Sequence, residues 1–293
     1  GGSRFKEKLF DVLKFSWPFG LAQILTRSYS YLDQIMLGLY KGDHDLGLYG
    51  VPYKITFALQ FIPQSLGAAL FPAMSDYFVN DKSKLAQLFE RSLIYLIMVG
   101  LPASVGIGLL AQLIIIKVYG AGFADSVLAL QIMISGLVFV FLNFPVGSLL
   151  NAANKQHYQT FNLGLTLASN ALVNILLIPK YSYIGSSIGV VVSMVVLFTA
   201  GIWQVNKFLE YSRRRVVGIF TKSLGSSIIM GLAIWLVSNL TGGRHAALLL
   251  LLPVVGSVVY IIMMLVTGAI KKADLTEVKI WALNRVGGGQ SAE

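Results

Sequence analysis

The stretch YQTFNLGLTLASNALVNILLI, residues 158–178, decides the fold. It is about 20 residues long, which is enough for a helix to cross a bilayer. At about 100° per residue its polar side chains fall within roughly 140° of arc, while the opposite half is apolar. A carboxamide that faces hydrocarbon without a partner is costly. The polar stripe is therefore expected to face other helices or a wet cavity, with the apolar half toward lipid; it comprises Asn162, Thr166, Ser169, Asn170 and Asn174.

The composition places the whole chain in the membrane. Of 293 residues, 56% are hydrophobic and 12% charged, and the mean hydropathy is +0.72, which is typical of an integral membrane protein. Without cysteine there is no disulfide framework and no thiolate metal site. The hydrophobic runs predict an all-α polytopic bundle of about eight transmembrane helices, near residues 12–39, 46–71, 93–116, 127–150, 158–178, 184–208, 217–240 and 246–267.

The net charge of +10 does not indicate nucleic acid, because the basic residues lie between the apolar spans. Eight spans put both ends of the chain on one side of the membrane. That side then collects 16 basic residues, and the other side keeps four: Lys41, Lys117, Lys180 and Arg244. The positive-inside rule predicts a multi-pass protein of the cytoplasmic (inner) membrane with both termini of this chain cytoplasmic.

The first span carries a polar face that includes an arginine. Gln23, Arg27, Ser30 and Gln34 fall within about 60° of one another on a helical wheel. An arginine away from the ends of a span is costly and marks a binding site or pathway by default. The alternative is a fixed ion pair between helices.

The second span adds a face with Tyr53, Thr56, Gln60 and Gln64, and Lys54 lies about 100° away from Tyr53. Lys54 is near the outer end, where it could instead reach outward to the membrane surface. The candidate substrate-binding residues from the three polar spans are Arg27, Gln23, Ser30, Gln34, Lys54, Gln60, Gln64 and Asn162.

A small-cation site is a separate hypothesis. Asn170 and Asn174 are one helical turn apart, so their carboxamide oxygens can converge. Asp33 offers the nearest intramembrane carboxylate, and hard oxygen ligands suit sodium as they suit other hard cations. The alternative is a hydrogen-bonded cluster between helices.

The sequence lacks the signatures of an enzyme. Its three histidines sit in different connections, with no HExxH or paired-carboxylate pattern beside them. We therefore expect no catalytic residue and no cofactor. We also expect no metal site apart from a coupling site for Na⁺ or H⁺. A non-transporting membrane scaffold or a lipid-modifying enzyme is the alternative outside transport.

Several local patterns occur in a fixed order along the chain. They are DQIMLG at 33–38 followed by GLY at 47–49, Ile62-Pro63 before LFP at 70–72, YGAGF at 119–123, LLNAAN at 149–154, Asn170 with Asn174, Ile178-Pro179, and Ile184-Gly185. Together, over residues 5–209, they resemble the second half of the polysaccharide flippases. These flippases belong to the multidrug/oligosaccharidyl-lipid/polysaccharide exporter superfamily, which also holds lipid II flippases and drug/cation antiporters.

The resemblance implies a domain organisation. Such transporters have two six-helix lobes around a central cavity, often with two added helices. Here it implies a second lobe at 1–210, an additional transmembrane hairpin at 211–270 and a cytoplasmic amphipathic tail at 271–293. The first lobe is then expected on a preceding N-terminal segment or on a partner chain.

The resemblance also implies a function. It is translocation of a polyprenyl-pyrophosphate-linked oligosaccharide across the membrane by alternating access, for surface polysaccharide assembly. Arg27, together with Lys54, would meet the pyrophosphate, and the Gln and Asn faces would bind sugar hydroxyls. A drug/cation antiporter and a lipid II flippase are the alternatives within the superfamily, and membrane lipid is the other expected partner.

Overall fold

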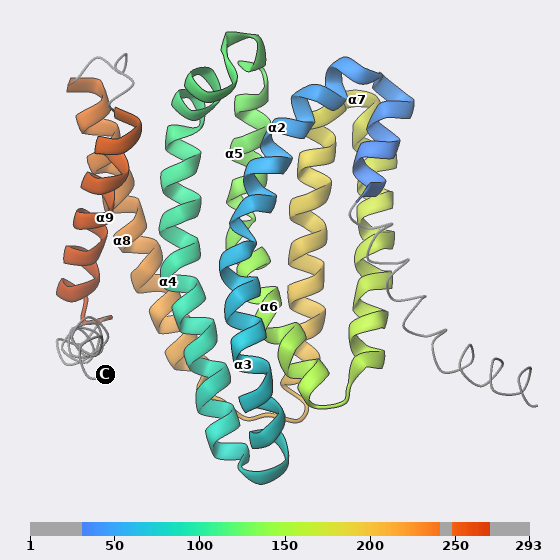
Figure 1. Cartoon of the computed structure of the whole chain (residues 1–293), viewed down its shortest axis with the longest axis vertical. Helices are drawn as coiled ribbons and strands as arrows, with labels where there is room; N and C mark the ends of the chain where they lie inside the picture. Colours follow the sequence, from blue (N-terminus) through green and yellow to red (C-terminus); the bar gives the residue numbers. More distant parts are fainter. Residues whose placement is uncertain (1–30, 241–247, 270–293) are drawn as a thin grey trace, which may run out of the picture.

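The computed structural model describes residues 31–240 and 248–269, in which helices run almost without interruption (Figure 1). Residues 31–41 are helical. The helices that follow are α2 (Asp43–Leu59), α3 (Phe61–Asn80), α4 (Lys82–Ile114) with a π-helical extension (Ile115–Tyr119), a 3₁₀ turn (Ala121–Phe123), α5 (Ser126–Ser135), α6 (Leu137–Ala152), α7 (Gln156–Val205), α8 (Arg213–Leu240) and α9 (Leu248–Val266).

Two of the expected spans are interrupted near their middle. The helix breaks at Gln60 between α2 and α3, three residues before Pro63. A proline ring clashes with the carbonyl four residues earlier and has no N–H to donate, so a break here is expected. The α5–α6 pair bends by 40° at Gly136, where a Cβ would lie only 3.1 Å from the Val191 side chain.

Helix α7 is a hairpin of two legs, residues 156–181 and 183–205, which lie antiparallel (Figure 1). Ser182 forms the turn with φ 50° and ψ −131°, a backbone conformation outside the helical region. Just after it, a Cβ on Gly185 would lie 2.6 Å from the backbone carbon of Leu177. The absence of a side chain at Gly185 therefore lets the two legs approach closely.

The lengths and hydropathy of these helices fit a membrane protein. Four stretches are long and apolar enough to cross a bilayer: Asp43–Asn80, Lys82–Tyr119, Gln156–Val205 and Arg213–Leu240. The bent α5–α6 pair raises the number to five, and Leu250–Val266 is a shorter apolar helix. The predicted all-α polytopic bundle is confirmed.

One boundary differs from the sequence-based expectation. The polar residues around Lys82 and Lys84 were expected in a connection before a span at 93–116, but α4 already begins at Lys82. Asp81 caps this helix by accepting a hydrogen bond from the Lys84 backbone N–H at 3.0 Å. The polar residues therefore occupy the first turns of a helix that extends beyond the apolar stretch.

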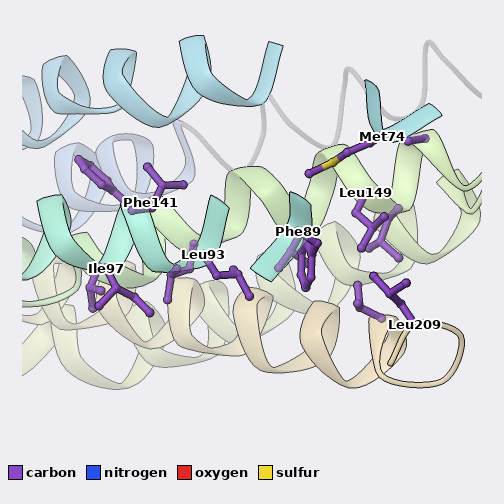
Figure 2. Packing of buried hydrophobic residues seen from close by; sticks show 14 of the residues in the cluster. Met74, Phe89, Leu93, Ile97, Phe141, Leu149 and Leu209 are labelled. Carbon is purple, nitrogen blue, oxygen red and sulfur yellow. The ribbon is translucent and has the colours of Figure 1, made fainter. Parts of the chain in front are cut away.

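A dry apolar core joins α3, α4 and α6 (Figure 2). Met74, Phe89 and Phe141 are fully buried in it, and Leu149 and Leu209 close it toward the end where α7 leads into α8. Close packing of such side chains excludes water and fixes the helices relative to one another.

The α8–α9 pair, which was expected to form an additional transmembrane hairpin, exposes apolar side chains on one face and buries polar ones on another. Trp235 and Leu236 are exposed, whereas α8 buries Ser223, Ser226 and Ser227. The Ser223 hydroxyl lies 2.7 Å from that of Tyr260, which donates to the Met98 carbonyl at 2.9 Å. Small serines allow close helix approach in a membrane, so the pair is attached to α4 through a polar seam.

The two ends of the bundle differ in charge. The end formed by the connections at 80–82, 152–156 and 206–212, here called the basic end, carries Lys82, Lys84, Arg91, Lys155, Lys207, Arg213, Arg214 and Arg215. The described part of the opposite end carries Lys41, Lys117 and Lys180. This asymmetry is the one that the positive-inside rule uses.

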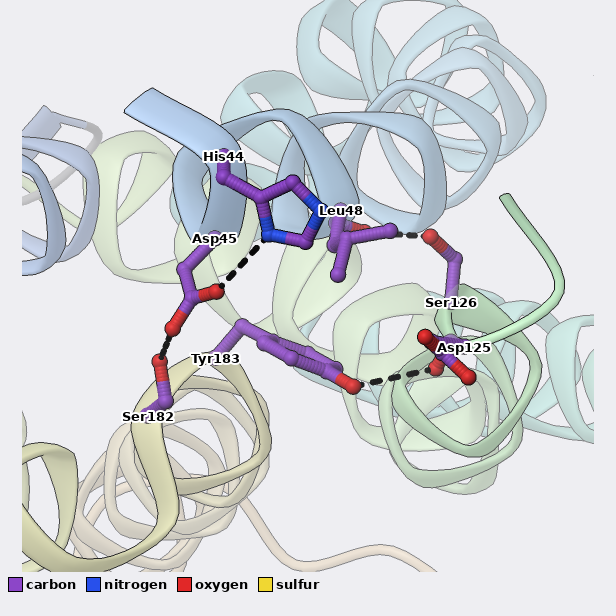
Figure 3. A network of polar contacts seen from close by, with 7 residues as sticks. All are labelled: His44, Asp45, Leu48, Asp125, Ser126, Ser182 and Tyr183. Atoms are coloured by element: carbon purple, nitrogen blue, oxygen red, sulfur yellow. Dashed lines mark hydrogen bonds and ion pairs between the residues drawn. The ribbon is translucent and has the colours of Figure 1, made fainter. Parts of the chain in front are cut away.

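Polar contacts tie the turns of the opposite end together (Figure 3). Asp45 accepts hydrogen bonds from the Ser182 hydroxyl and from His44 Nδ1. Ser126 Oγ donates to the Leu48 carbonyl at 2.8 Å. These contacts hold the hairpin turn of α7 and the start of α5 against α2.

Candidate functional site

The polar stripe of residues 158–178 faces the inside of the bundle, as predicted. Asn162, Thr166, Asn170 and Asn174 are buried in α7. The apolar half is turned outward, with Leu165, Leu172, Ile175 and Leu176 all exposed. An exposed apolar face of this kind suits contact with lipid.

Within the bundle the stripe meets the carboxylate of Asp33, which is only 3% exposed. Asn174 Nδ2 donates to Asp33 Oδ1 at 2.6 Å and to Asn170 Oδ1 at 3.0 Å. The Tyr49 hydroxyl donates to the second oxygen of Asp33 at 3.0 Å. Three segments far apart in the sequence therefore converge on one carboxylate: helical residues 31–41, α2 and the first leg of α7.

The second leg of α7 completes the cluster. Asn170 Nδ2 donates to Ser193 Oγ at 3.2 Å, and Ser193 in turn donates to the Gly189 carbonyl at 2.6 Å. Gly189 also lies against the carboxamide of Asn174: a Cβ there would be 2.5 Å from Asn174 Oδ1. A glycine is therefore needed for the Asn174 side chain to occupy this position.

One oxygen in the cluster lacks a partner. Asn174 Oδ1 is buried and accepts no hydrogen bond in the described structure, although buried carbonyl oxygens are nearly always satisfied. It lies against Gly189, while the amide nitrogen of the same side chain donates to the oxygens of Asp33 and Asn170. Carboxylate and carboxamide oxygens such as these are hard donors of the kind that small cations bind.

A small cavity of about 80 Å³ lies beside Asp33. It is bounded by the broken region between α2 and α3, the bend at Gly136 and the second leg of α7; its walls include Asp33, Tyr53, Thr56, Phe57, Gln60, Gly136 and Met194. Because one water takes about 30 Å³ of liquid volume, the cavity has room for an ion or a few waters and is far too small for an oligosaccharide.

Charge balance supports the same conclusion. None of the ion pairs among the described residues includes Asp33; they are His44–Asp45, Lys84–Asp81 and Arg215–Glu90. A buried carboxylate without a countercharge is costly unless it binds a cation or takes up a proton. The described residues hold no group of three His, Cys, Asp or Glu that would suit a transition metal. The carboxylate and carboxamide oxygens of the cluster are of the kind that binds Na⁺, and the carboxylate of Asp33 can also take up a proton.

The other candidate residues do not all join this site. Gln23, Arg27 and Ser30 lie outside the described residues. Gln34 is half-buried next to Asp33, and Gln60 lines the cavity at the α2–α3 break. Lys54 and Gln64 are exposed on the outer face of α2 and α3, so they are not lining residues of the described cavity.

Asn162 lies away from the Asp33 cluster. Its amide exchanges two hydrogen bonds, each 2.8 Å, with the amide of Gln204 on the second leg of α7. Near this pair, Gly201 allows the second leg to approach α6 closely, since a Cβ there would lie 2.6 Å from the Val146 side chain. In this conformation Asn162 joins the two legs; its predicted role in binding substrate stays a prediction.

Sequence reasoning missed Tyr49, Ser193 and Gly189 as parts of the site. A signal for two of them was present: Gly185, Gly189 and Ser193 recur every four residues, a pattern of small side chains that favours close packing of membrane helices. No comparable pattern indicated Tyr49, whose hydroxyl reaches Asp33 only through the packing of α2.

Comparisons with known proteins agree with this fold. Residues 3–128 match the family described as Polysaccharide biosynthesis protein. An uncharacterized membrane protein of Methanocaldococcus jannaschii is 28% identical over 62% of this chain and 36% of its own length. The probable flippase AglR of Haloferax volcanii is 26% identical over 64% of this chain and 39% of its own length.

Among solved structures, the lipid II flippase MurJ in an inward closed conformation superposes with a TM-score of 0.72 at 18% identity. The match covers 88% of this chain and 54% of MurJ. The chain thus spans about half of that structure and less than half of the two curated relatives. The structural match shows a shared fold, and the sequence matches agree with the resemblance to the multidrug/oligosaccharidyl-lipid/polysaccharide exporter superfamily.

Within that superfamily, the sequence likeness is to the polysaccharide flippases. The resemblance drawn from the motifs between residues 33 and 185 is therefore confirmed.

Proposed function

We propose that this chain forms part of a flippase that moves a polyprenyl-pyrophosphate-linked oligosaccharide across the cytoplasmic membrane by alternating access. The observation that carries the proposal is the polar cluster around Asp33, built inside a lobe whose surface is largely apolar. No described residue forms an ion pair with Asp33, and a buried carboxylate of this kind suits ion-coupled transport better than a purely structural bundle.

The relatives support the choice of cargo. The matching family is described by polysaccharide biosynthesis, and AglR carries the name of a flippase. Because the 80 Å³ cavity cannot hold an oligosaccharide, the cargo would bind on the surface of this lobe. We propose that a second lobe, on the same polypeptide or on a partner chain, encloses that surface.

Coupling would act through the Asp33 cluster. Its oxygens come from residues 31–41 and the first leg of α7, and its supporting hydroxyls come from α2 and the second leg. A bound Na⁺ or proton would neutralise Asp33 and so favour the packing in which these segments converge. An ion shifts a conformational equilibrium only by its difference in affinity for the two states. The cluster supplies this difference in affinity if its oxygens move apart in the other conformation of the transporter.

Arg27 is the proposed anchor for the pyrophosphate, together with Lys54, because both are cations and the diphosphate is an anion. Arg27→Ala in the intact transporter is expected to abolish flipping, measured by restoration of surface polysaccharide in a flippase-deficient strain. Expression and thermal stability should stay close to those of the unmodified protein. If Arg27 pairs only with the substrate, its removal leaves no buried protein group without a partner.

Controls separate this role from a structural one. If Arg27 is half of a buried ion pair, Arg27→Ala would instead destabilise the protein by about 3–5 kcal/mol, and Asp33→Asn would partly rescue it. Arg27→Lys keeps the charge but loses the bidentate fork, so weak transport should remain. Lys117→Ala, at an exposed lysine of the opposite end, should leave transport intact.

We propose that the basic end faces the cytoplasm, as the charge asymmetry favours. Cysteines introduced at Asp43 and Thr241 should label from outside the cell with a membrane-impermeant thiol reagent, and those at Lys84 and Ser212 should not. The reverse pattern would invert the orientation and with it the proposed direction of transport.

The domain boundaries belong to the same proposal. The six-helix lobe would end near residue 210, and α8–α9 would form the additional hairpin at 211–270. The connection at 206–212 and the packing of α8 and α9 on each other support this division, although their apolar cluster also includes Leu110 of α4. A drug/cation antiporter, the rival within the superfamily, would be favoured if flipping failed while an organic cation was exported.

A further inference from the structure

The basic end holds a polar groove that the transport proposal does not use. Its volume is about 770 Å³, and it lies between the first turns of α4 and the connection that follows α7. Lys82 and Lys207 line it from these two segments, together with the polar side chains of Ser83, Gln87 and Ser212. Two lysines that are 125 positions apart in sequence are thus brought to one groove.

The lysines around this groove rest on aromatic rings. Lys82 Nζ lies 3.1 Å from the centroid of the Phe78 ring, and Lys207 Nζ lies 3.3 Å from the Trp203 ring. The half-buried Lys155 lies 5.1 Å from the Phe208 ring, which packs edge-on against Phe78 at 6.4 Å. Such cation–π contacts fix the direction of each ammonium group while leaving its donors free.

Their charges are not neutralised by carboxylates. The ion pairs found among residues 31–240 and 248–269 use Lys84 and Arg215 at this end, but none uses Lys82, Lys155 or Lys207. Lys82 and Lys155 are close enough to repel each other. Glu90, at the edge of the groove, is already held by Arg215 at 3.1 Å and by the Ser212 backbone N–H at 3.1 Å.

Trp203 places the groove at the membrane surface. Its side chain is 62% exposed on the outside of the bundle, one helical turn before Lys207. Tryptophan favours the level of the lipid headgroups, and lysines beside it meet their phosphates. The exposed Glu210 also lines the groove, so a singly charged phosphodiester fits better than a doubly charged free phosphate.

We propose that this groove binds the phosphodiester headgroup of an anionic phospholipid of the surrounding membrane, with Lys82 and Lys207 as its phosphate ligands and Lys155 adding long-range attraction. The site is separate from the Asp33 cluster, since the groove and the cavity beside Asp33 share no lining residue. It would hold the α3–α4 turn and the α7–α8 connection together through a bound lipid.

The test is a titration of the purified protein in neutral detergent with dioctanoyl phosphatidylglycerol, with bound lipid counted by native mass spectrometry. Dioctanoyl phosphatidylcholine, of equal chain length but no net charge, should bind much more weakly. The double variant Lys82→Ala/Lys207→Ala should bind phosphatidylglycerol about 25-fold more weakly, at about 5-fold for each membrane-proximal lysine. The matched pair Lys117→Ala/Lys180→Ala, at the opposite end, should bind it normally.

Three further measurements test whether charge causes the binding and whether the ligand is a lipid. Lys82→Arg/Lys207→Arg should retain binding, which shows that the alanine pair loses charge and not the fold. Glu210→Gln should tighten binding by removing the opposing charge. Inorganic phosphate at the same concentration should not displace the lipid; displacement would identify a free-phosphate site and overturn the proposal. Equal phosphatidylglycerol binding by the alanine pair and the unmodified protein would overturn it as well.

Discussion

Two regions of the bundle differ in the side chains that they bury. The core of α3, α4 and α6 is dry and apolar, with Phe89 and Phe141 fully buried. The region where residues 31–41, α2 and α7 meet buries Asp33, Asn170 and Asn174 instead. Packing in the first region fixes the helices, whereas the second region buries the Asp33 carboxylate and an Asn174 oxygen that accepts no hydrogen bond. The first region supports the lobe, and the second is the candidate functional site.

The largest expected effect is a loss of stability in the apolar core. Phe89→Ala should lower the free energy of unfolding by about 3–5 kcal/mol, because it removes a large buried ring and leaves a cavity. Unfolding in mixed detergent micelles would measure it. Asp33→Asn should change the same quantity by less than about 1 kcal/mol, because it removes a buried charge and the Asn174 amide can turn its free oxygen toward the new amide.

If Asp33→Asn proved as destabilising as Phe89→Ala, the polar cluster would be part of the support and the contrast between the regions would fail.

The next effect concerns the hairpin that carries the polar cluster. Gly185→Ala should destabilise the protein by about 1–3 kcal/mol, because the new Cβ would lie 2.6 Å from the Leu177 backbone and force the legs apart. Gly164→Ala is the matched control: it lies on the first leg, with open space around its Cα. The control should leave thermal stability unchanged, and equal losses in both variants would remove the close approach as the cause.

A smaller change in stability, with a clear functional effect, is expected at Gly189. Gly189→Ala would place a Cβ 2.5 Å from Asn174 Oδ1 and displace that amide from the cluster. We expect about 1 kcal/mol of destabilisation and a loss of the response of transport to the coupling ion. An unchanged ion response would show that the position of the Asn174 oxygen is irrelevant to coupling.

The smallest effect is expected at the ion pair between the exposed Arg215 and the buried Glu90. Glu90→Gln should cost about 1 kcal/mol or less, because Arg215 is exposed and water screens the pair. Raising the salt concentration should shrink the difference in unfolding midpoint between this variant and the unmodified protein. If Glu90→Gln lowered the free energy of unfolding by more than Gly185→Ala does, the basic end would be one of the regions that stabilise the lobe.

Much of this arrangement could be predicted from the sequence, and the reasons are physical. A buried carboxamide needs partners, so the spacing of Asn170 and Asn174 placed them inside, and the same argument selected Asp33. The hydroxyls of Tyr49 and Ser193 could not be assigned, because a helical wheel does not say which helices meet. The turn at Ser182 falls in the connection expected between the spans at 158–178 and 184–208, but its backbone conformation could not be predicted, since it depends on contacts such as that with Asp45.

The pairing of Asn162 with Gln204 shows the same limit. The period of the helix predicts which face a side chain occupies, but the partner on a neighbouring leg depends on the depth and register of packing. Glycine positions carry part of that information, as Gly201 and Gly189 illustrate.

The central claim is that the Asp33 cluster couples transport to a cation. Its most direct test is the rate of flipping of a lipid-linked oligosaccharide by the intact protein in liposomes, with and without an imposed Na⁺ or H⁺ gradient. One of the two gradients should accelerate the unmodified protein, and Asp33→Asn should lose that acceleration while keeping its fold. A full response to the same gradient in Asp33→Asn would contradict the account.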